Sequence, residues 1–286
     1  MPKIPIKHIT TGAFEAGYSG VFSIREISGL INDNDMVQAL HGHSHYLVLV
    51  LDKAKGSHVI DFVPYELNRH SVFIMRPGQV HSLTLESGSS GYLMQFSAEF
   101  YYPLNKESHR LLRRASNKNL CCVNDDRFNR LLNVLKQMQI EFNERQEGYL
   151  EVIKSSLSIF FIELLRNRKN ESETEGHQLY AHERLEEFME HLEKHVYKHK
   201  QVSEYAEMMN LSTYQLNAII KSTIGKTCSE AINAQIMLES KRRLLAGSDQ
   251  ISTIADDLGY EDVSYFIRFF KKQTGYTPEA YRKHFA

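Results

Sequence analysis

In the first hundred positions, the hydrophobic residues lie in short runs separated by turn residues. Runs of this length, rich in β-branched and aromatic side chains, are typical of strands. Their regular spacing predicts an all-β region, either a sandwich or a barrel. The runs cover Val21 to Ile27, Tyr46 to Asp52, Ser57 to Phe62, Ser71 to Met75, His81 to Leu85 and Gly91 to Phe96.

Beyond the strands, the hydrophobic period lengthens to that of α-helices. Two apolar stripes at helical spacing predict two helices. The second stripe is wide enough to pack against the strands on one side and against a second subunit on another. Packing within a single chain is the alternative. The first stripe comprises Phe128, Leu131, Leu132, Leu135, Met138 and Phe142, and the second comprises Leu150, Ile153, Leu157, Phe160, Phe161, Leu164 and Leu165.

A polar segment at residues 167–178 lacks apolar periodicity and contains Gly176, which indicates a linker. A helix is expected from Tyr180 to His195. The chain is therefore expected to contain one domain at residues 1–166 and another at 179–286. The predicted fold class is α+β, with an all-α second domain.

One pattern occurs twice in the second domain. Ala206 is repeated as Ala255 after 49 residues, and Leu216, Ile219, Ile220, Lys221 and Gly225 are repeated as Phe266, Phe269, Phe270, Lys271 and Gly275 after 50. A small residue where two helices cross, followed by a turn residue that tolerates positive φ, is typical of a helix-turn-helix. Asn210 and Gly259 suit the two turns. Ser212 and Asp262 are predicted N-caps of the two second helices.

The two second helices should bury their apolar residues and expose polar ones. Polar and basic side chains on an exposed helix can contact base edges and phosphates. An ordinary helical bundle would explain one copy as well, but two copies joined by one helix, about Ser229 to Leu245, favour DNA binding.

A longer set of residues resembles the signature of the AraC/XylS regulators. It includes Ile236 to Leu245, Ile251 to Ala255, Leu258 to Phe266, Arg268 to Lys272 and the closing Gly275-Tyr-Thr-Pro, and it covers about the last hundred residues. The resemblance implies two recognition helices in successive major grooves on one face of promoter DNA, with RNA polymerase as a further partner.

The same resemblance assigns the DNA contacts by position. Base contacts are expected from Thr213, Tyr214, Gln215 and Asn217 in the first unit and from Ser264, Tyr265 and Arg268 in the second. Phosphate contacts are expected from Lys221, Arg242, Lys271 and Lys272. A solvated polar face is the alternative for each of them.

Histidines in the strand region, with Gly56, Ile60 to Phe62 and Arg76-Pro-Gly, resemble the small cupin barrel that precedes the DNA-binding domain in many of these regulators. Such a barrel implies a ligand-holding role, and the resemblance to the family points to dimerisation at the second of the two helices that follow the barrel. The expected effector walls are His41, His43, Tyr46, Phe62, His81 and Tyr92. Core packing is the alternative for Phe62 and Tyr92.

Histidines at alternate positions of a strand, such as His41 and His43, point to the same side of the sheet. Imidazole is a common ligand of zinc and iron, so these histidines and His81 raise the hypothesis of a metal site. Enzymatic cupins usually add a glutamate soon after the first histidines, whereas the segment from Tyr46 to Leu51 has no carboxylate. We therefore expect no metal and no other cofactor, and histidines that line a polar pocket or are simply exposed.

Composition and charge change this picture little. The chain has 286 residues, 42% of them hydrophobic, and a net charge of −1. From Lys221 to Ala286 there are ten Lys or Arg residues and eight Asp or Glu residues, a weak basic footprint for a DNA-binding protein. The sequence shows neither a membrane-length apolar run nor a signal peptide, and its three cysteines form no disulfide or zinc pattern.

The prediction is a cytoplasmic, homodimeric transcriptional activator that senses a small molecule and is not an enzyme. Two rivals remain. One is a metal-dependent cupin enzyme with an accessory DNA-binding module. The other is a regulator that responds to no ligand.

Overall fold

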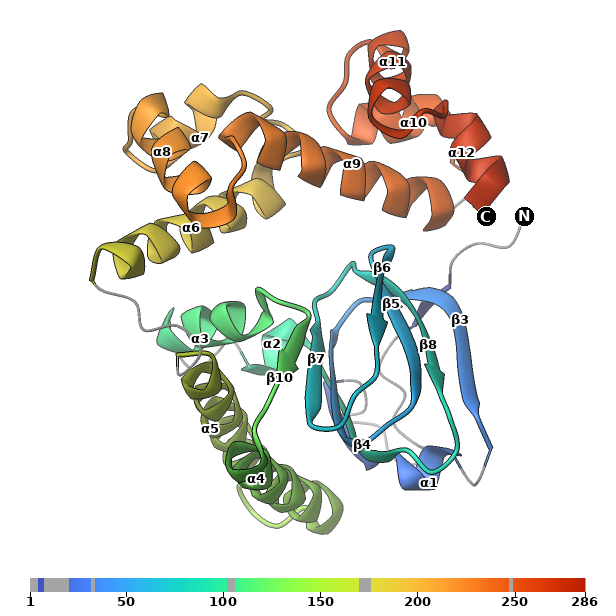
Figure 1. The fold of residues 1–286 in the computed structure, drawn as a ribbon, viewed down its shortest axis with the longest axis vertical. Coiled ribbons are helices and arrows are strands. Elements are labelled where there is room, and N and C mark those ends of the chain that lie inside the picture. Colours follow the sequence, from blue (N-terminus) through green and yellow to red (C-terminus); the bar gives the residue numbers. More distant parts are fainter. Residues whose placement is uncertain are drawn as a thin grey trace. The chain divides into compact units, whose positions relative to one another are not determined.

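The computed structural model describes residues 5–7, 21–31, 34–101, 106–169, 176–246 and 249–285 (Figure 1). The chain divides into two compact units, Pro5–Glu173 and Thr174–Ala286. Within the described residues, all strands lie in the first unit, and the second unit is helical. The predicted α+β class is therefore confirmed.

Hydrogen bonds divide the described strands into two five-stranded sheets, and not into one closed barrel. All paired neighbours are antiparallel except β1 and β3, which are parallel. The first sheet has the order β1 (Ile6–Lys7), β3 (Met36–His43), β8 (Val80–Leu85), β5 (Gly56–Ile60) and β6 (Val63–Glu66). The second has the order β10 (Leu120–Cys122), β7 (Ser71–Met75), β4 (Tyr46–Lys53), β9 (Ser90–Phe96) and β2 (Phe22–Glu26).

Strand β4 is buried on both faces, so it reads as a continuous apolar run and not as an alternating one. Leu47, Leu49 and Leu51 point into a core that includes residues of both sheets. Tyr46, Val48 and Val50 alternate with them and belong to a second core, which also includes helical residues. The first unit thus has three layers: a sheet, a second sheet and helices.

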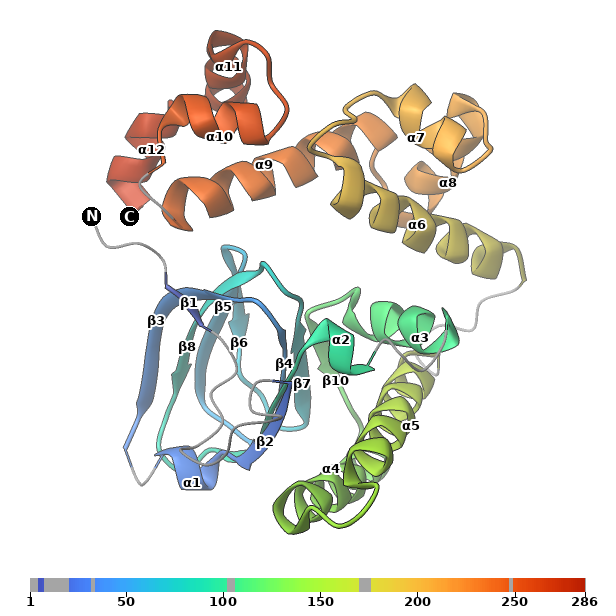
Figure 2. The same cartoon turned by 180° about the vertical axis from the view of Figure 1, so that it is seen from behind.

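The helical layer consists of α2 (Ala98–Tyr101), α3 (Lys106–Ser116), α4 (Asp125–Glu144) and α5 (Tyr149–Lys169). Figure 2 shows α3, α4 and α5 together beside the strands. The predicted stripes on α4 and α5 supply buried residues such as Phe128, Leu131, Leu157 and Phe161. Arg127 of α4 also donates to the nearly buried carboxylate of Glu163 on α5 at 2.9 Å. A short helix, α1 (Ser28–Ile31), follows β2.

The predicted linker overlaps helices at both ends, because α5 continues to Lys169 and α6 (Gly176–His195) begins at Gly176. The amide of Asn167 donates to the carbonyl of Cys122 at 2.8 Å, so the start of the expected linker packs within the first unit.

The second unit consists of seven helices among the described residues: α6, α7 (Val202–Met208), α8 (Thr213–Ile224), α9 (Cys228–Ala246), α10 (Ile251–Asp257), α11 (Val263–Thr274) and α12 (Pro278–Phe285). In Figure 1, α9 runs from the α7–α8 pair to the α10–α11 pair. The helix expected at about Ser229 to Leu245 is therefore confirmed. No described helix has the length and apolar content that a membrane crossing requires.

Candidate functional site

Helices α7 and α8 form the first helix-turn-helix unit. Ala206 is 2% exposed where the helices meet, and Asn210 adopts a φ of 52° in the turn. The Ser212 hydroxyl accepts from the backbone N–H of Gln215 at 3.2 Å, as an N-cap does. The predicted small residue, turn residue and cap are confirmed.

Helices α10 and α11 repeat this arrangement. Ala255 is fully buried, Gly259 has a φ of 71°, and Asp262 Oδ1 accepts from the backbone N–H of Ser264 at 2.7 Å. Gly275 ends α11 in the left-handed conformation, as Gly225 ends α8. The internal repeat in the sequence is therefore a repeat in structure.

The face of α8 that carries the predicted base contacts is largely exposed. Thr213, Tyr214, Gln215 and Lys221 are exposed, and Tyr214 reaches 83%. Asn217 differs, because its Oδ1 accepts from the backbone N–H of Cys228 at 3.0 Å, at the start of α9. This side chain connects two helices of the fold and is not presented with the others.

The corresponding face of α11 is more basic. Ser264, Tyr265, Arg268, Lys271 and Lys272 are all exposed. The Arg268 guanidinium lies 3.7 Å from the carboxylate of Asp262, and both side chains are open to solvent. At the repeat offset of 50 residues, Arg268 corresponds to Ala218, which is exposed and which the sequence analysis missed.

Arg242, a predicted phosphate contact, is less exposed than the other predicted contacts. Its side chain is only 12% exposed and pairs with Glu239 on the same helix, α9. A groove of about 840 Å³ nevertheless lies between α9 and α11, and Asn233, Tyr265, Arg268 and Lys272 line it together with Lys200. Lys200 and Asn233 join this face through the fold, which the sequence analysis did not foresee.

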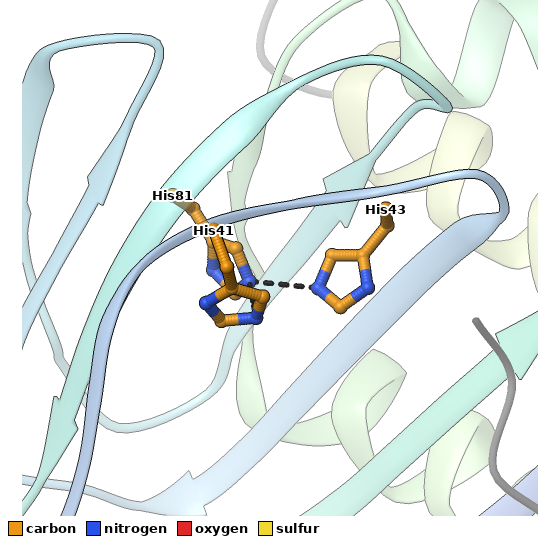
Figure 3. Close-up of side chains that lie close together, drawn as sticks. All are labelled: His41, His43 and His81. Carbon is orange, nitrogen blue, oxygen red and sulfur yellow. Dashed lines mark hydrogen bonds between the residues drawn. The ribbon is translucent and has the colours of Figure 1, made fainter. Parts of the chain in front are cut away.

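Three histidines from two strands of the first unit meet in its interior. Figure 3 shows His41 and His43 from β3 with His81 from β8. The His81 Nε2 atom lies 2.8 Å from His43 Nε2 and 3.0 Å from His41 Nε2. All three residues are at most 3% exposed, so the alternative of histidines that are simply exposed is wrong.

A fourth imidazole, which the sequence analysis missed, lies behind this group. The Nε2 atom of His58, on β5, is 2.7 Å from His81 Nδ1, and His58 is fully buried. Burial lowers the pKa of His43 and of His58 to about 3, and also lowers those of His41 and His81. The four rings are therefore neutral at ordinary pH. We call His41, His43, His58 and His81 the histidine cluster.

Two of the other predicted effector walls, Tyr46 and Tyr92, lie apart from the histidine cluster. Tyr46 stacks on Phe96 at 5.1 Å, and both residues, like Tyr92, belong to the core that faces the helices. Phe62 occupies the turn between β5 and β6 with a φ of 68°. The structure thus brings together His41, His43 and His81 but separates them from Tyr46 and Tyr92 by the second sheet.

The donor atoms of this cluster fit a metal ion. The ligand nitrogens of His41, His43 and His81 all lie within 4.8 Å of one another. Tetrahedral zinc with Zn–N bonds of about 2.0–2.1 Å separates its nitrogens by about 3.3 Å, and two of the three separations here are 2.8 Å and 3.0 Å. The His41 Nδ1 atom lies 2.7 Å from the carbonyl oxygen of Ala39, which can only accept, so Nδ1 carries the proton and Nε2 keeps its lone pair.

The helical unit matches a known family of domains. Residues 205–284 match the family described as "Helix-turn-helix domain". The chain is 24% identical over 253 residues to the HTH-type transcriptional activator RhaR of Yersinia pestis, covering 86% of this chain and 84% of RhaR. It is 24% identical over 247 residues to the activator RhaS of Pectobacterium atrosepticum, with coverages of 85% and 86%.

Two solved structures are also similar. The carboxy-terminal domain of the response regulator yesN from Fusobacterium nucleatum is 29% identical, covers 34% of this chain and 95% of its own, and gives a TM-score of 0.32. ToxT from Vibrio cholerae is 19% identical, with coverages of 92% and 97% and a TM-score of 0.44. The chain therefore carries a carboxy-terminal helix-turn-helix domain, and over most of its length it is similar to the activators RhaR and RhaS.

Proposed function

We propose that this protein is a transcriptional activator that binds promoter DNA through its two helix-turn-helix units. The observation that carries the proposal is the pair of exposed polar helices, α8 and α11, attached to the two ends of α9. Homology to RhaR and RhaS, which are named as activators of transcription, supports the same function. The protein is accordingly a regulator and not an enzyme, and we place it in the cytoplasm with the chromosome.

On this proposal, α8 and α11 enter successive major grooves, whose centres are about 34 Å apart along one face of DNA. Arg268 is the strongest candidate for base recognition, because a guanidinium can form two hydrogen bonds with guanine. Tyr214, Gln215, Ser264 and Tyr265 contribute further base contacts. Lys221, Lys271 and Lys272 bind phosphates, which makes binding sensitive to salt.

The first unit acts as the sensor in this proposal, as a cupin-like domain that holds a small effector at the histidine cluster. An effector changes DNA binding only if it binds one arrangement of the protein more tightly than another. A homodimer would form through α5, where Val152, Ile159 and Ile162 are 39%, 51% and 38% exposed. Bound at a promoter, the dimer would contact RNA polymerase.

Selection of bound sites from random DNA by the full-length protein tests the proposal. We expect enrichment of sequences that contain two short motifs about one helical turn apart. Repeating the selection with cell metabolites would reveal an effector as a change in affinity for the enriched sites. Absence of any enriched sequence at low salt would contradict the proposed function.

A further inference from the structure

Residues 197–200, which connect α6 to α7, contact the second helix-turn-helix unit directly. The Lys200 ammonium donates to the carbonyl of Gly259, 59 residues further along the chain in the turn between α10 and α11, at 2.8 Å. The same ammonium lies 4.9 Å from the ring centre of Tyr260. A Cβ placed on Gly259 would lie only 1.8 Å from the carbonyl oxygen of Tyr197. The segment that precedes the first unit therefore packs on the turn of the second.

The same segment is fastened to the first unit. The carboxylate of Glu204, in the first turn of α7, accepts from the backbone N–H groups of Lys200 at 3.0 Å and of Gln201 at 2.8 Å. The buried Tyr205 of α7 donates its hydroxyl to the carbonyl of His199 at 2.8 Å. Two successive side chains of α7 therefore hold residues 199–201 in place.

The connecting helix α9 contacts the segment as well. Tyr197 donates its hydroxyl to Glu239 of α9 at 3.1 Å. The Arg243 guanidinium, one turn further along α9, lies 5.3 Å from the ring centre of Tyr197 and pairs with Asp257 of α10. Residues 197–200, α9 and the second unit thus form one continuous set of contacts.

The two turns of the repeat differ in a way that this contact explains. Asn210 occupies the turn of the first unit with a φ of 52°, and Gly259 occupies the equivalent position of the second with a φ of 71°. Left-handed backbone alone does not require glycine, because asparagine also tolerates it. The carbonyl of Tyr197 supplies the further reason, since it occupies the space that a side chain on Gly259 would need.

We infer that residues 197–200 form a brace, which fixes the rotation of α11 relative to α8 and so decides which spacing of the two DNA motifs the protein accepts. The inference rests on the proposed function, because it names the residues that select the operator spacing. Lys200 is the main positioning residue of the brace. It acts through the carbonyl of Gly259 and the ring of Tyr260, and not by contact with a base.

The brace restrains rotation, whereas α9 sets distance. α9 has 19 residues, and at about 1.5 Å per residue it extends about 28 Å, so its length determines how far apart the two units lie. Contacts beside a helix oppose the rotation of one attached unit about the helix axis. The brace is such a contact, because it joins α7 to the turn between α10 and α11 without passing through α9.

One inserted base pair changes both distance and rotation. It moves the second motif about 3.4 Å along the duplex and about 35° around it. A braced protein follows that rotation only if the contact between Lys200 and Gly259 breaks, whereas an unbraced protein has no such contact to lose. An unbraced protein also has more freedom to lose on binding, so it should bind the preferred spacing less tightly.

Operator spacing tests the brace in the full-length protein. Fluorescence anisotropy gives affinities for the selected operator and for versions with one base pair added or removed between the two motifs. Lys200→Met keeps an aliphatic side chain and removes the donor. In this variant the affinity ratio of preferred to altered spacing should be smaller than in wild type by about threefold or more. Lys198→Met, at an exposed neighbouring lysine, is the matched control and should give the wild-type ratio.

Gly259→Asn tests the same contact from the other side. Asparagine tolerates the left-handed turn, but its Cβ would displace the Tyr197 carbonyl, so the affinity ratio should fall as in Lys200→Met. Gly225→Asn is the matched control, because Gly225 has a φ of 69° and open space where the Cβ would lie. Circular dichroism checks that both asparagine variants fold.

The spacing series separates a brace from a simple phosphate contact. If Lys200→Met loses affinity by the same factor at every spacing, Lys200 is a phosphate contact in the groove beside α11, and the brace is overturned. A folded Gly259→Asn protein with the wild-type ratio would overturn it too. A spacing preference that all variants share would leave the proposed function without the brace, whereas wild-type protein that binds no DNA would remove both.

Discussion

The side-chain oxygen of Asn217 accepts a hydrogen bond from the backbone N–H of Cys228 at 3.0 Å. The first N–H groups of a helix have no partner within that helix, so Asn217 satisfies one such group at the start of α9. A residue expected to contact bases therefore fastens the first recognition helix to the connecting helix.

We predict that Asn217→Ala lowers the free energy of unfolding by about 1 kcal/mol, because it leaves the Cys228 N–H without this partner. Urea denaturation measures the change, and site selection with the variant should return the same base preferences as the wild type. An altered preference at one base with unchanged stability would assign Asn217 to base recognition instead.

Arg268→Ala is expected to weaken specific operator binding by about 1–3 kcal/mol, which corresponds to a factor of roughly 5 to 150. Its side chain is 69% exposed, so the thermal midpoint should not change. Fluorescence anisotropy at physiological salt measures the affinity. Lys283→Ala, with a similarly exposed basic side chain on α12, should retain wild-type binding. Equal affinities for wild type and Arg268→Ala would exclude this arginine from the interface.

Ala255→Leu is expected to destabilise the second unit by about 1–3 kcal/mol, because the added carbons overpack the crossing of α10 and α11. Ala255 is fully buried, whereas Ala218 on α8 is exposed and gives the matched substitution, Ala218→Leu. Thermal denaturation of both variants should show a loss only for Ala255→Leu. If the two proteins melt together, the crossing is looser than the structure indicates.

Ile159→Glu is expected to weaken self-association of the protein, because it places a charge in the exposed stripe of α5. Ile140→Glu on α4 is the control, since the two isoleucines are 51% and 49% exposed. Sedimentation equilibrium should detect a shift towards monomer only for Ile159→Glu. Dimers of unchanged stability in both variants would place the subunit interface elsewhere.

Local chemistry was enough to predict the helix-turn-helix units. Ser212 and Asp262 cap the helices that follow them, and Asn210 and Gly259 adopt the left-handed turns, because each of these roles depends on a few neighbouring residues. The Asn217 assignment shows where this reasoning stops. Buried Leu216 and Ile220 set the helix face, and Ala218, not Asn217, occupies the position that corresponds to Arg268.

The histidine cluster was only partly predictable, because it depends on pairing between distant strands. His41 and His43 share β3 and could be grouped by alternation along a strand. His58 joins them only because β5 pairs with β8, which places Ile60 opposite His81. Tyr46 was misplaced for a related reason: β4 is buried on both faces, so its hydrophobic pattern does not reveal which side faces the other sheet.

Phe73 links the histidine side of the second sheet to its opposite side. Its ring meets His58, while its chain neighbours Val72 and Ile74 belong to the core shared with α4 and α5. Close-packed interiors have low compressibility and pass displacement on instead of absorbing it. If the proposed effector moved His58 on binding, the closely packed second sheet would pass that displacement on to the side that α4 and α5 cover.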